Sequence, residues 1–186
     1  MAMITPDAID DRVPLCVDLD GTLIATDLLW VSLCQVLRRA PWLALALPFW
    51  WRRGRGFLKA ELARRATLDY KRLPYFEDVL DFLREERARG RRLVLVTGSH
   101  ERYALELAAE LGLFEEVLAT TATLNVTGRC KAALLVERYG LRGFDYMGNN
   151  RVDLPVWSVA RRAFVVRAPA WVRRRARALG NVEREW

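Results

Sequence analysis

The apolar positions of this chain follow two alternating patterns along most of its length. Short apolar or β-branched runs, which are typical of buried strands, are found at residues 14–17, 92–98, 116–120, 144–148 and 163–166. Longer segments in which apolar residues recur every three to four positions, which are typical of amphipathic helices, are found at residues 28–39, 57–67, 77–89, 100–111 and 130–139. Strands that alternate with helices predict an α/β fold with a doubly wound parallel sheet and right-handed crossovers.

A segment rich in tryptophan and arginine follows the first predicted strand. It contains four of the seven tryptophans, which are Trp30, Trp42, Trp50 and Trp51. Its apolar run at residues 42–51 is interrupted by Pro48 and is too short to cross a bilayer, which takes about 20 residues. Tryptophans flanked by arginines are typical of a segment that lies in a membrane interface. A small helical cap over an active site explains the same composition, and the two interpretations are compatible.

Length and charge narrow the possible classes of protein. The 186 residues suffice for one domain with a modest insertion, and the net charge of +7 favours an anionic partner, either nucleic acid or a membrane surface. The alternative explanation of the positive charge is an arginine-rich proteome that uses arginine where others use lysine. No base-reading motif is found, so we do not expect nucleic acid as a partner. The three cysteines are far apart in the sequence, at Cys16, Cys34 and Cys130, which is typical of a reducing compartment. The N-terminus lacks the pattern of a secretory signal peptide. We therefore expect a cytoplasmic protein, located at the cytoplasmic face of the inner membrane if the cap binds lipid.

The candidate chemistry begins where the first predicted strand ends. The run Val17-Asp18-Leu19-Asp20-Gly21-Thr22-Leu23 delivers two carboxylates to the strand's carboxyl end, which is where open α/β sheets bind ligands. Asp18 and Asp20 are two positions apart on an extended backbone, so they point to the same side and repel each other unless a cation lies between them. Mg²⁺ prefers such oxygen ligands. The alternative is a simple turn in which Gly21 supplies a positive φ.

Three further polar signals follow in a defined order. Thr97 and Gly98 end the second clear strand, Lys131 lies in the first turn of a helix, and Asp153 follows the strand at residues 144–148. Together with the two acids of the first loop, this order and these contexts resemble the haloacid dehalogenase-like (HAD) hydrolases. The resemblance covers essentially the whole chain. It implies a HAD-type Rossmannoid core at residues 1–26 and 76–186, with a small helical cap inserted at residues 27–75.

The resemblance also implies a role for each residue of the motifs. Asp18 is expected as the nucleophile that forms an aspartyl-phosphate, and Asp20 as the general acid and base. Lys131 is expected to neutralise charge on the reacting groups. The residues implied in phosphate binding are Thr22, Thr97 and Gly98, and those implied in Mg²⁺ binding are Asp18, Asp20, Asn149 and Asp153. Because dehalogenating members of the family lack the second acid, the presence of Asp20 favours a phosphate-ester hydrolase.

One position departs from the family pattern. Gly-Asp usually begins the fourth motif, whereas this chain has Gly148-Asn149. The asparagine offers a neutral oxygen in place of a carboxylate, so we expect weaker Mg²⁺ binding. A HAD-like domain with little turnover, which serves a regulatory or scaffolding role beside a membrane prenyltransferase, is therefore the alternative function.

A narrower resemblance concerns residues 144–157, which read Phe-Asp-Tyr-Met-Gly-Asn-Asn-Arg-Val-Asp-Leu-Pro-Val-Trp. This run and the tryptophan- and arginine-rich insertion are similar to the HAD domain that is fused N-terminally to UbiA-type prenyltransferases. The resemblance implies a phosphorylated small molecule or a polyprenyl-linked phosphate as substrate. It also implies a membrane domain that follows this chain.

Overall fold

A computed structural model describes residues 13–121 and 124–186, and contains one six-stranded sheet. All strand pairs are parallel, in the order β3-β2-β1-β4-β5-β6. The strands are β1 (Leu15–Val17), β2 (Leu93–His100), β3 (Glu116–Thr120), β4 (Asp145–Gly148), β5 (Ala163–Val165) and β6 (Val182–Glu185). The predicted parallel α/β fold is confirmed. The signal pattern and the start of the first core segment, which were considered for residues 1–12, lie outside the described residues.

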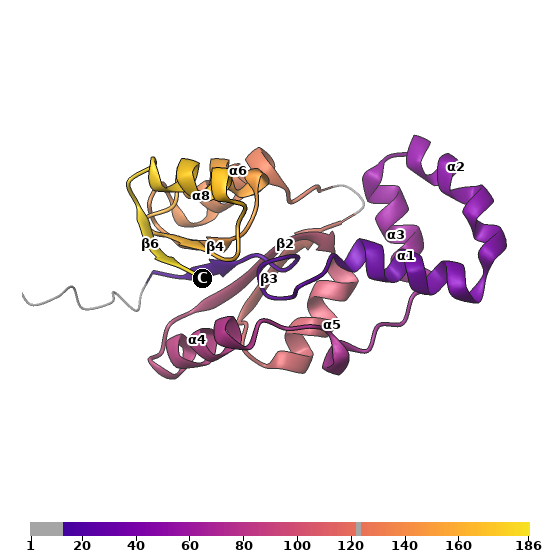
Figure 1. Ribbon diagram of the computed structural model, residues 1–186, viewed down its shortest axis with the longest axis horizontal. Helices are drawn as coiled ribbons and strands as arrows, with labels where there is room; N and C mark the ends of the chain where they lie inside the picture. Colours follow the sequence, from indigo (N-terminus) through magenta and orange to yellow (C-terminus); the bar gives the residue numbers. More distant parts are fainter. Residues whose placement is uncertain (1–12, 122–123) are drawn as a thin grey trace, which may run out of the picture.

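Helices cover both faces of the sheet. In Figure 1, α4 (Glu77–Ala88) and α5 (Glu101–Leu111) lie below the strands, and α6 (Gly128–Tyr139) and α8 (Ala170–Arg177) lie above them. Successive strand residues point to opposite faces, so each strand contributes to two apolar cores. Leu15 and Val17 pack on the first face, whereas Cys16 packs on the second. The central strand β1 is fully buried for this reason, and it reads as an uninterrupted apolar run.

The segment between β1 and α4 forms a group of helices beyond one end of the sheet (Figure 1). It consists of α1 (Leu28–Arg39), the 3₁₀ turn η1 (Pro41–Ala46), α2 (Leu47–Arg52) and α3 (Arg55–Arg65). The 3₁₀ turn η2 (Tyr70–Arg72) follows and lies beside α5, where the hydroxyl of Tyr70 donates to Glu106. Asp27 caps α1 by accepting hydrogen bonds from the N–H groups of Leu29 and Trp30. We call residues 27–75 the cap segment. The division between this cap and a core domain stays a prediction, and apolar residues of the two parts join one cluster.

Two elements at the end of the chain were not predicted. The short helix α7 (Leu154–Trp157) follows the 3₁₀ turn η3 (Arg151–Asp153), and β6 adds an edge to the sheet beyond β5. The sequence of β6, Val-Glu-Arg-Glu, is mostly polar because an edge strand leaves half of its surface in water. Trp186 follows β6 and packs its ring against Phe82 and Phe164. Among the described residues, no helix has the length and apolarity that crossing a bilayer would take.

Candidate active site

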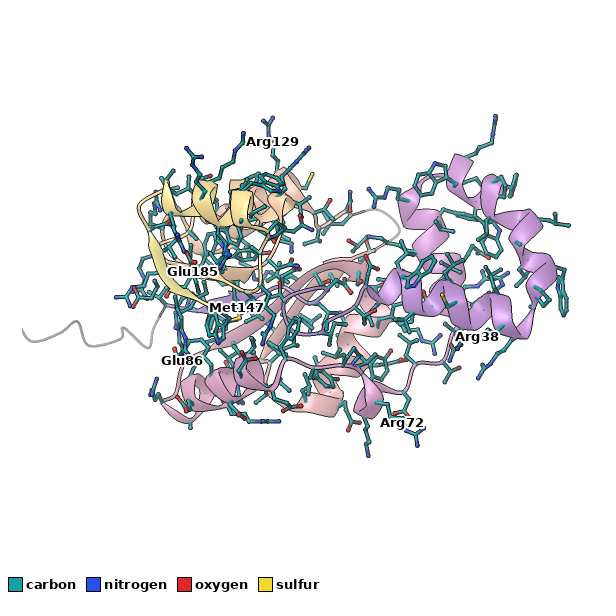
Figure 2. All side chains as sticks on the ribbon, viewed as in Figure 1. Arg38, Arg72, Glu86, Arg129, Met147 and Glu185 are labelled. Carbon is teal, nitrogen blue, oxygen red and sulfur yellow. The ribbon has the colours of Figure 1, made fainter. Side chains whose placement is uncertain are left out.

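The carboxyl ends of the three central strands meet at one edge of the sheet. Asp18 continues β1, and its N–H donates to the carbonyl of Met147 on β4 at 3.0 Å. In Figure 2, Met147 is labelled between the upper and lower groups of helices. Because β1, β2 and β4 are parallel neighbours, the loops that follow them converge here. The loops that carry Asp18 and Asn149 are therefore brought side by side.

Asp18 and Lys131 form a buried ion pair. The Nζ atom of Lys131 lies 2.7 Å from Oδ1 of Asp18, and the lysine is only 3% exposed. Burial raises the pKa of Asp18 to about 7, Lys131 acts against this rise, and the carboxylates of Asp153 and Asp20 add to it. Loss of hydration is thus the main reason that the Asp18 carboxyl holds its proton more tightly than a free aspartate does.

A hydroxyl group connects this ion pair to the last acid of the motifs. Lys131 Nζ also donates to the hydroxyl of Tyr146 at 2.8 Å, and that hydroxyl donates to Oδ1 of Asp153 at 2.8 Å. Burial and the two acids raise the pKa of Tyr146 well above its ordinary value, so the phenol keeps its proton. Tyr146 was not predicted as a site residue, because an aromatic residue inside a buried strand looks like any core residue.

Asp20 lies between the cap segment and the carboxyl end of β2. Its Oδ1 accepts from the N–H of Leu28 at 2.8 Å, and its Oδ2 accepts from the hydroxyl of Ser99 at 2.6 Å. Burial and the Asp27 carboxylate raise the pKa of Asp20 to about 6, although these two hydrogen bonds favour the charged form. A carboxyl group with a raised pKa is suited to exchange protons near neutral pH. Ser99 was also missed, although it lies only two positions after Thr97.

Asp153 is held in place by the backbone of the preceding loop. Its Oδ2 accepts from the N–H groups of Asn149 at 3.0 Å and Asn150 at 2.9 Å. A Cβ atom on Gly148 would lie 2.7 Å from the Cγ of Asp153, so only glycine permits this approach. Asp153 is fully buried. The first and fourth motifs also touch, because a Cβ on Gly21 would lie 2.1 Å from Nδ2 of Asn149.

Asp18, Asp20 and Lys131 lie at the wall of a polar cavity of about 320 Å³. The residues that line it are Asp18, Asp20, Asp27, Leu29, Arg55, Lys59, Gly98, Ser99, Thr127, Gly128, Lys131, Asn149, Asn150 and Val152. Of the predicted site residues, Thr22, Thr97 and Asp153 do not line it. Thr97 is fully buried, and its hydroxyl accepts from the N–H of Ser99 at 3.0 Å. Thr22 is also fully buried, so phosphate binding by Thr22 and Thr97 stays a prediction.

The cap segment contributes two cations that sequence reasoning did not assign to the site. Arg55 and Lys59 lie one helical turn apart on α3 and both line the cavity. The Nζ atom of Lys59 donates to the carbonyl of Gly98, which joins the cap segment to the carboxyl end of β2. Burial and the nearby Arg55 lower the pKa of Lys59. The sequence signal that could have identified Arg55 and Lys59 is their spacing of four positions, which places both on one side of a helix. Arg129, which was considered for phosphate binding, is exposed and lies on the outside of the molecule (Figure 2).

The predicted metal ligands offer oxygen donors only, which is the donor set that Mg²⁺ prefers. Asp18, Asp20 and Asn149 line the cavity, and Oδ1 of Asp153 accepts a single hydrogen bond, so that it keeps a free lone pair. Within residues 13–121 and 124–186, no group of three or more His, Cys, Asp or Glu side chains is placed to hold a metal ion. A site made of two carboxylates, a backbone carbonyl and an amide oxygen is compatible with that finding. The residues therefore fit Mg²⁺.

Comparison with known proteins extends this picture. Residues 15–158 match the family described as haloacid dehalogenase-like hydrolase. The chain is 35% identical over 167 residues to an uncharacterized protein, y4nM, of Sinorhizobium fredii; the match covers 89% of this chain and 32% of that protein. This chain thus spans about a third of the length of that relative.

Two solved structures share the fold. A protein of unknown function from Bordetella pertussis Tohama I superposes with a TM-score of 0.70 at 19% identity, over 92% of this chain and 97% of that one. A phosphoserine phosphatase with bound substrate superposes with a TM-score of 0.58 at 14% identity, over 88% of this chain and 90% of that one. At these identities the likeness concerns the fold alone.

Proposed function

Because this chain belongs to the haloacid dehalogenase-like hydrolase family, we propose that it is a Mg²⁺-dependent phosphatase that hydrolyses phosphate monoesters. The observation that carries the proposal is the pairing of two differently placed acids at one cavity. Asp18 is bonded to a buried lysine, whereas Asp20 is bonded to a hydroxyl and a backbone N–H and has a raised pKa. One acid can thus act as a nucleophile while the other handles protons.

In the proposed reaction an oxygen of Asp18 attacks phosphorus, and the bond from phosphorus to the ester oxygen breaks. Asp20 gives its proton to the departing alkoxide, which leaves as an alcohol. Asp20 then takes a proton from a water molecule, whose oxygen attacks the phosphorus of the aspartyl-phosphate and releases inorganic phosphate and Asp18. Lys131 stabilises the negative charge that passes between Asp18 and the phosphoryl oxygens.

Mg²⁺ would be held by Asp18, the backbone carbonyl of Asp20, Asn149 and Asp153. When bound, it would neutralise charge on the phosphoryl group. The hydroxyl of Tyr146 holds the side chains of Asp153 and Lys131 in position by hydrogen-bonding to both. The site's own residues thus orient the nucleophile and carry the proton, and the cap segment contributes Asp27, Leu29, Arg55 and Lys59 to the wall of the cavity.

The proposal is tested with an activated aryl phosphate, p-nitrophenyl phosphate, and Mg²⁺. We expect turnover that chelation with EDTA removes and that Asp18→Asn abolishes. Asp81→Asn is the matched control, because Asp81 is exposed on α4 and pairs with Arg84 at the surface. Folding of each variant is checked by circular dichroism.

An absence of turnover at high Mg²⁺ concentration would contradict the proposal and support a regulatory or scaffolding domain beside a membrane prenyltransferase. Asn149 favours this second candidate, because the position lacks the carboxylate that is usual in the family. The two candidates therefore differ in one measurable property.

For the partners and location, we propose that the cap segment contacts the anionic cytoplasmic face of the inner membrane. Large apolar side chains are exposed on it, at Trp30, Trp42, Leu45, Phe49 and Trp51, and unburied arginines lie among them, at Arg38, Arg39, Arg52 and Arg53. Arg38 is labelled on the cap in Figure 2. Apolar rings surrounded by cations suit a surface of acyl chains and anionic headgroups.

Trp50 does not belong to this surface, in contrast to the sequence interpretation. It is 6% exposed, and its ring lies 4.9 Å from the guanidinium carbon of Arg65. We expect Trp42→Ser with Trp51→Ser to release the protein from vesicles that contain phosphatidylglycerol. Trp171→Ser is the control, since Trp171 is also exposed beside arginines but lies on α8. Equal sedimentation of the three proteins would contradict membrane contact through the cap.

We further propose a lipid-linked or membrane-proximal phosphate as substrate, and a UbiA-type prenyltransferase domain as the neighbour in the same polypeptide. The 32% coverage of the longer relative y4nM is compatible with a module joined to another domain. The sequence encoded in frame after Trp186 tests the second part. A reading frame without membrane-spanning segments there would contradict it.

A further inference from the structure

A second, apolar hollow lies in the cap segment beside the polar cavity. It measures about 610 Å³ and is formed between α1, η1, α2 and α3. Its lining residues are Asp27, Leu29, Trp30, Leu33, Ala44, Leu47, Pro48, Trp51, Leu58 and Leu62. This volume is in the range of ligand pockets, roughly 300–1,000 Å³. The hollow is therefore large enough for a ligand group.

The chemistry of this hollow differs from that of the catalytic cavity. Apart from Asp27, every lining side chain is aliphatic, aromatic or proline. A sugar or a nucleotide base would leave most of its polar groups without partners here, which is unfavourable. A hydrocarbon chain has no such requirement and gains from leaving water.

The two spaces adjoin each other. Asp27 and Leu29 line both of them. On α3, Leu58 faces the hollow and its neighbour Lys59 faces the catalytic cavity. A molecule with a charged end and an apolar end can therefore place the charged end near Lys59 and Lys131 and the apolar end in the hollow.

We infer that this hollow binds the apolar chain of the substrate, so that the protein acts on phosphate monoesters of long-chain alcohols. The inference rests on the proposed phosphatase function and names the substrate class of the same site. The reactive phosphoryl group lies at Asp18, the leaving oxygen lies near Asp20, and the chain passes Leu29 into the cap. The exposed rings of Trp30 and Trp51 form part of the hollow's wall and also belong to the surface proposed above to contact the membrane.

The test compares n-alkyl phosphates of increasing chain length, from butyl to decyl, below their micelle concentrations and without vesicles. We expect kcat/KM to rise with each added methylene by up to about fourfold while the chain still enters the hollow, and on the order of 100-fold over the series. p-Nitrophenyl phosphate, which has no chain, reports the chemistry alone.

Variants that fill the hollow test its position. Ala44 lines the hollow but is exposed, so Ala44→Trp adds volume without disturbing a packed core. Leu33→Trp adds volume from α1. Leu37→Trp is the matched control, because Leu37 lies one turn further on the same helix and is absent from the lining. We expect the ratio of decyl to butyl kcat/KM to fall at least about tenfold in both filling variants and to stay as in the wild type in the control.

Calorimetric titration separates this inference from the proposed function. It uses butyl and decyl phosphate with Asp18→Asn protein, with and without Ala44→Trp. Hydrolysis of all chain lengths at one rate and with one affinity would overturn the inference and leave the phosphatase intact. Tighter binding of decyl phosphate that Ala44→Trp weakens, without turnover by the wild type, would uphold the chain site and overturn the phosphatase. Equal effects of Ala44→Trp and Leu37→Trp would also overturn the inference.

Discussion

The Nζ atom of Lys131 lies 2.7 Å from Oδ1 of Asp18, although 113 positions separate the two residues in the chain. The lysine comes from the first turn of α6, and the acid comes directly after β1. Both side chains are buried, so the attraction is less screened than at the surface. Removing either partner would leave the other charge buried without its counterion.

Replacement of Lys131 is expected to reduce turnover strongly. In Lys131→Met the reacting phosphoryl group loses a cation, and we expect kcat to fall by about 10²–10³-fold, as for other removed electrostatic donors. The measurement is steady-state hydrolysis of p-nitrophenyl phosphate. Arg129→Met serves as control, since this arginine is exposed two positions earlier on α6. A loss of less than about tenfold would contradict the role of Lys131.

The hydroxyl of Tyr146 is expected to stabilise the site and the fold together. Tyr146→Phe keeps the ring but removes the group that bonds Lys131 and Asp153, so two buried polar groups each lose a partner. We expect the free energy of unfolding to fall by about 1–3 kcal/mol, measured by urea denaturation, and kcat to fall with it. Tyr139→Phe is the control, because the hydroxyl of Tyr139 bonds to Glu116, away from the site. If both variants lowered the free energy of unfolding and kcat equally, the hydroxyl of Tyr146 would have no role specific to the site.

Gly21 is expected to tolerate no side chain. Its φ is +74°, and a Cβ would lie 2.1 Å from Nδ2 of Asn149. Gly112→Ala provides a matched control, because Gly112 has a φ of +62° and a Cβ added there would meet nothing within 4 Å. The control should lose about 1–2 kcal/mol of stability from backbone strain, whereas Gly21→Ala should lose more.

A double variant isolates the clash. Adding Asn149→Gly to Gly21→Ala removes the side chain that the new Cβ would meet, so the excess loss of stability should largely disappear. The measurement is thermal or urea unfolding of the single and double variants. Additive effects would mean that the two residues do not interact.

Restoring a carboxylate at position 149 is expected to strengthen metal binding. Asn149→Asp adds a charged oxygen at the wall of the cavity, so the Mg²⁺ concentration for half-maximal turnover should fall by roughly tenfold. Asn125→Asp is the control, because Asn125 is exposed and does not line the cavity. An unchanged Mg²⁺ dependence in Asn149→Asp would contradict metal binding at this position.

Local patterns predicted most of the secondary structure. The apolar run before Asp18 predicted β1, and the periodic segment at residues 77–89 predicted α4, which ends at Ala88 before a glycine with a φ of +88°. These signals are local, because burial in a sheet or along one face of a helix fixes the spacing of apolar residues within the element itself. The edge strand β6 escaped prediction because half of its surface lies in water and its residues are polar.

The sequence alone was sufficient to determine the parallel α/β fold, and it identified acids that follow β1 and β4 and a lysine in the first turn of α6 as candidates for one site, because parallel strands bring their carboxyl ends to one edge. Only the tertiary structure decided which other groups reach that edge. The site also contains Tyr146, Ser99 and Lys59, because the fold brings these side chains within hydrogen-bond distance of groups on other elements. The periodicity of apolar residues along the chain carries no information about such distances. The same holds for Trp50, which packs inward while Trp51 faces water, because the direction of each ring depends on the fold of α2 against α3.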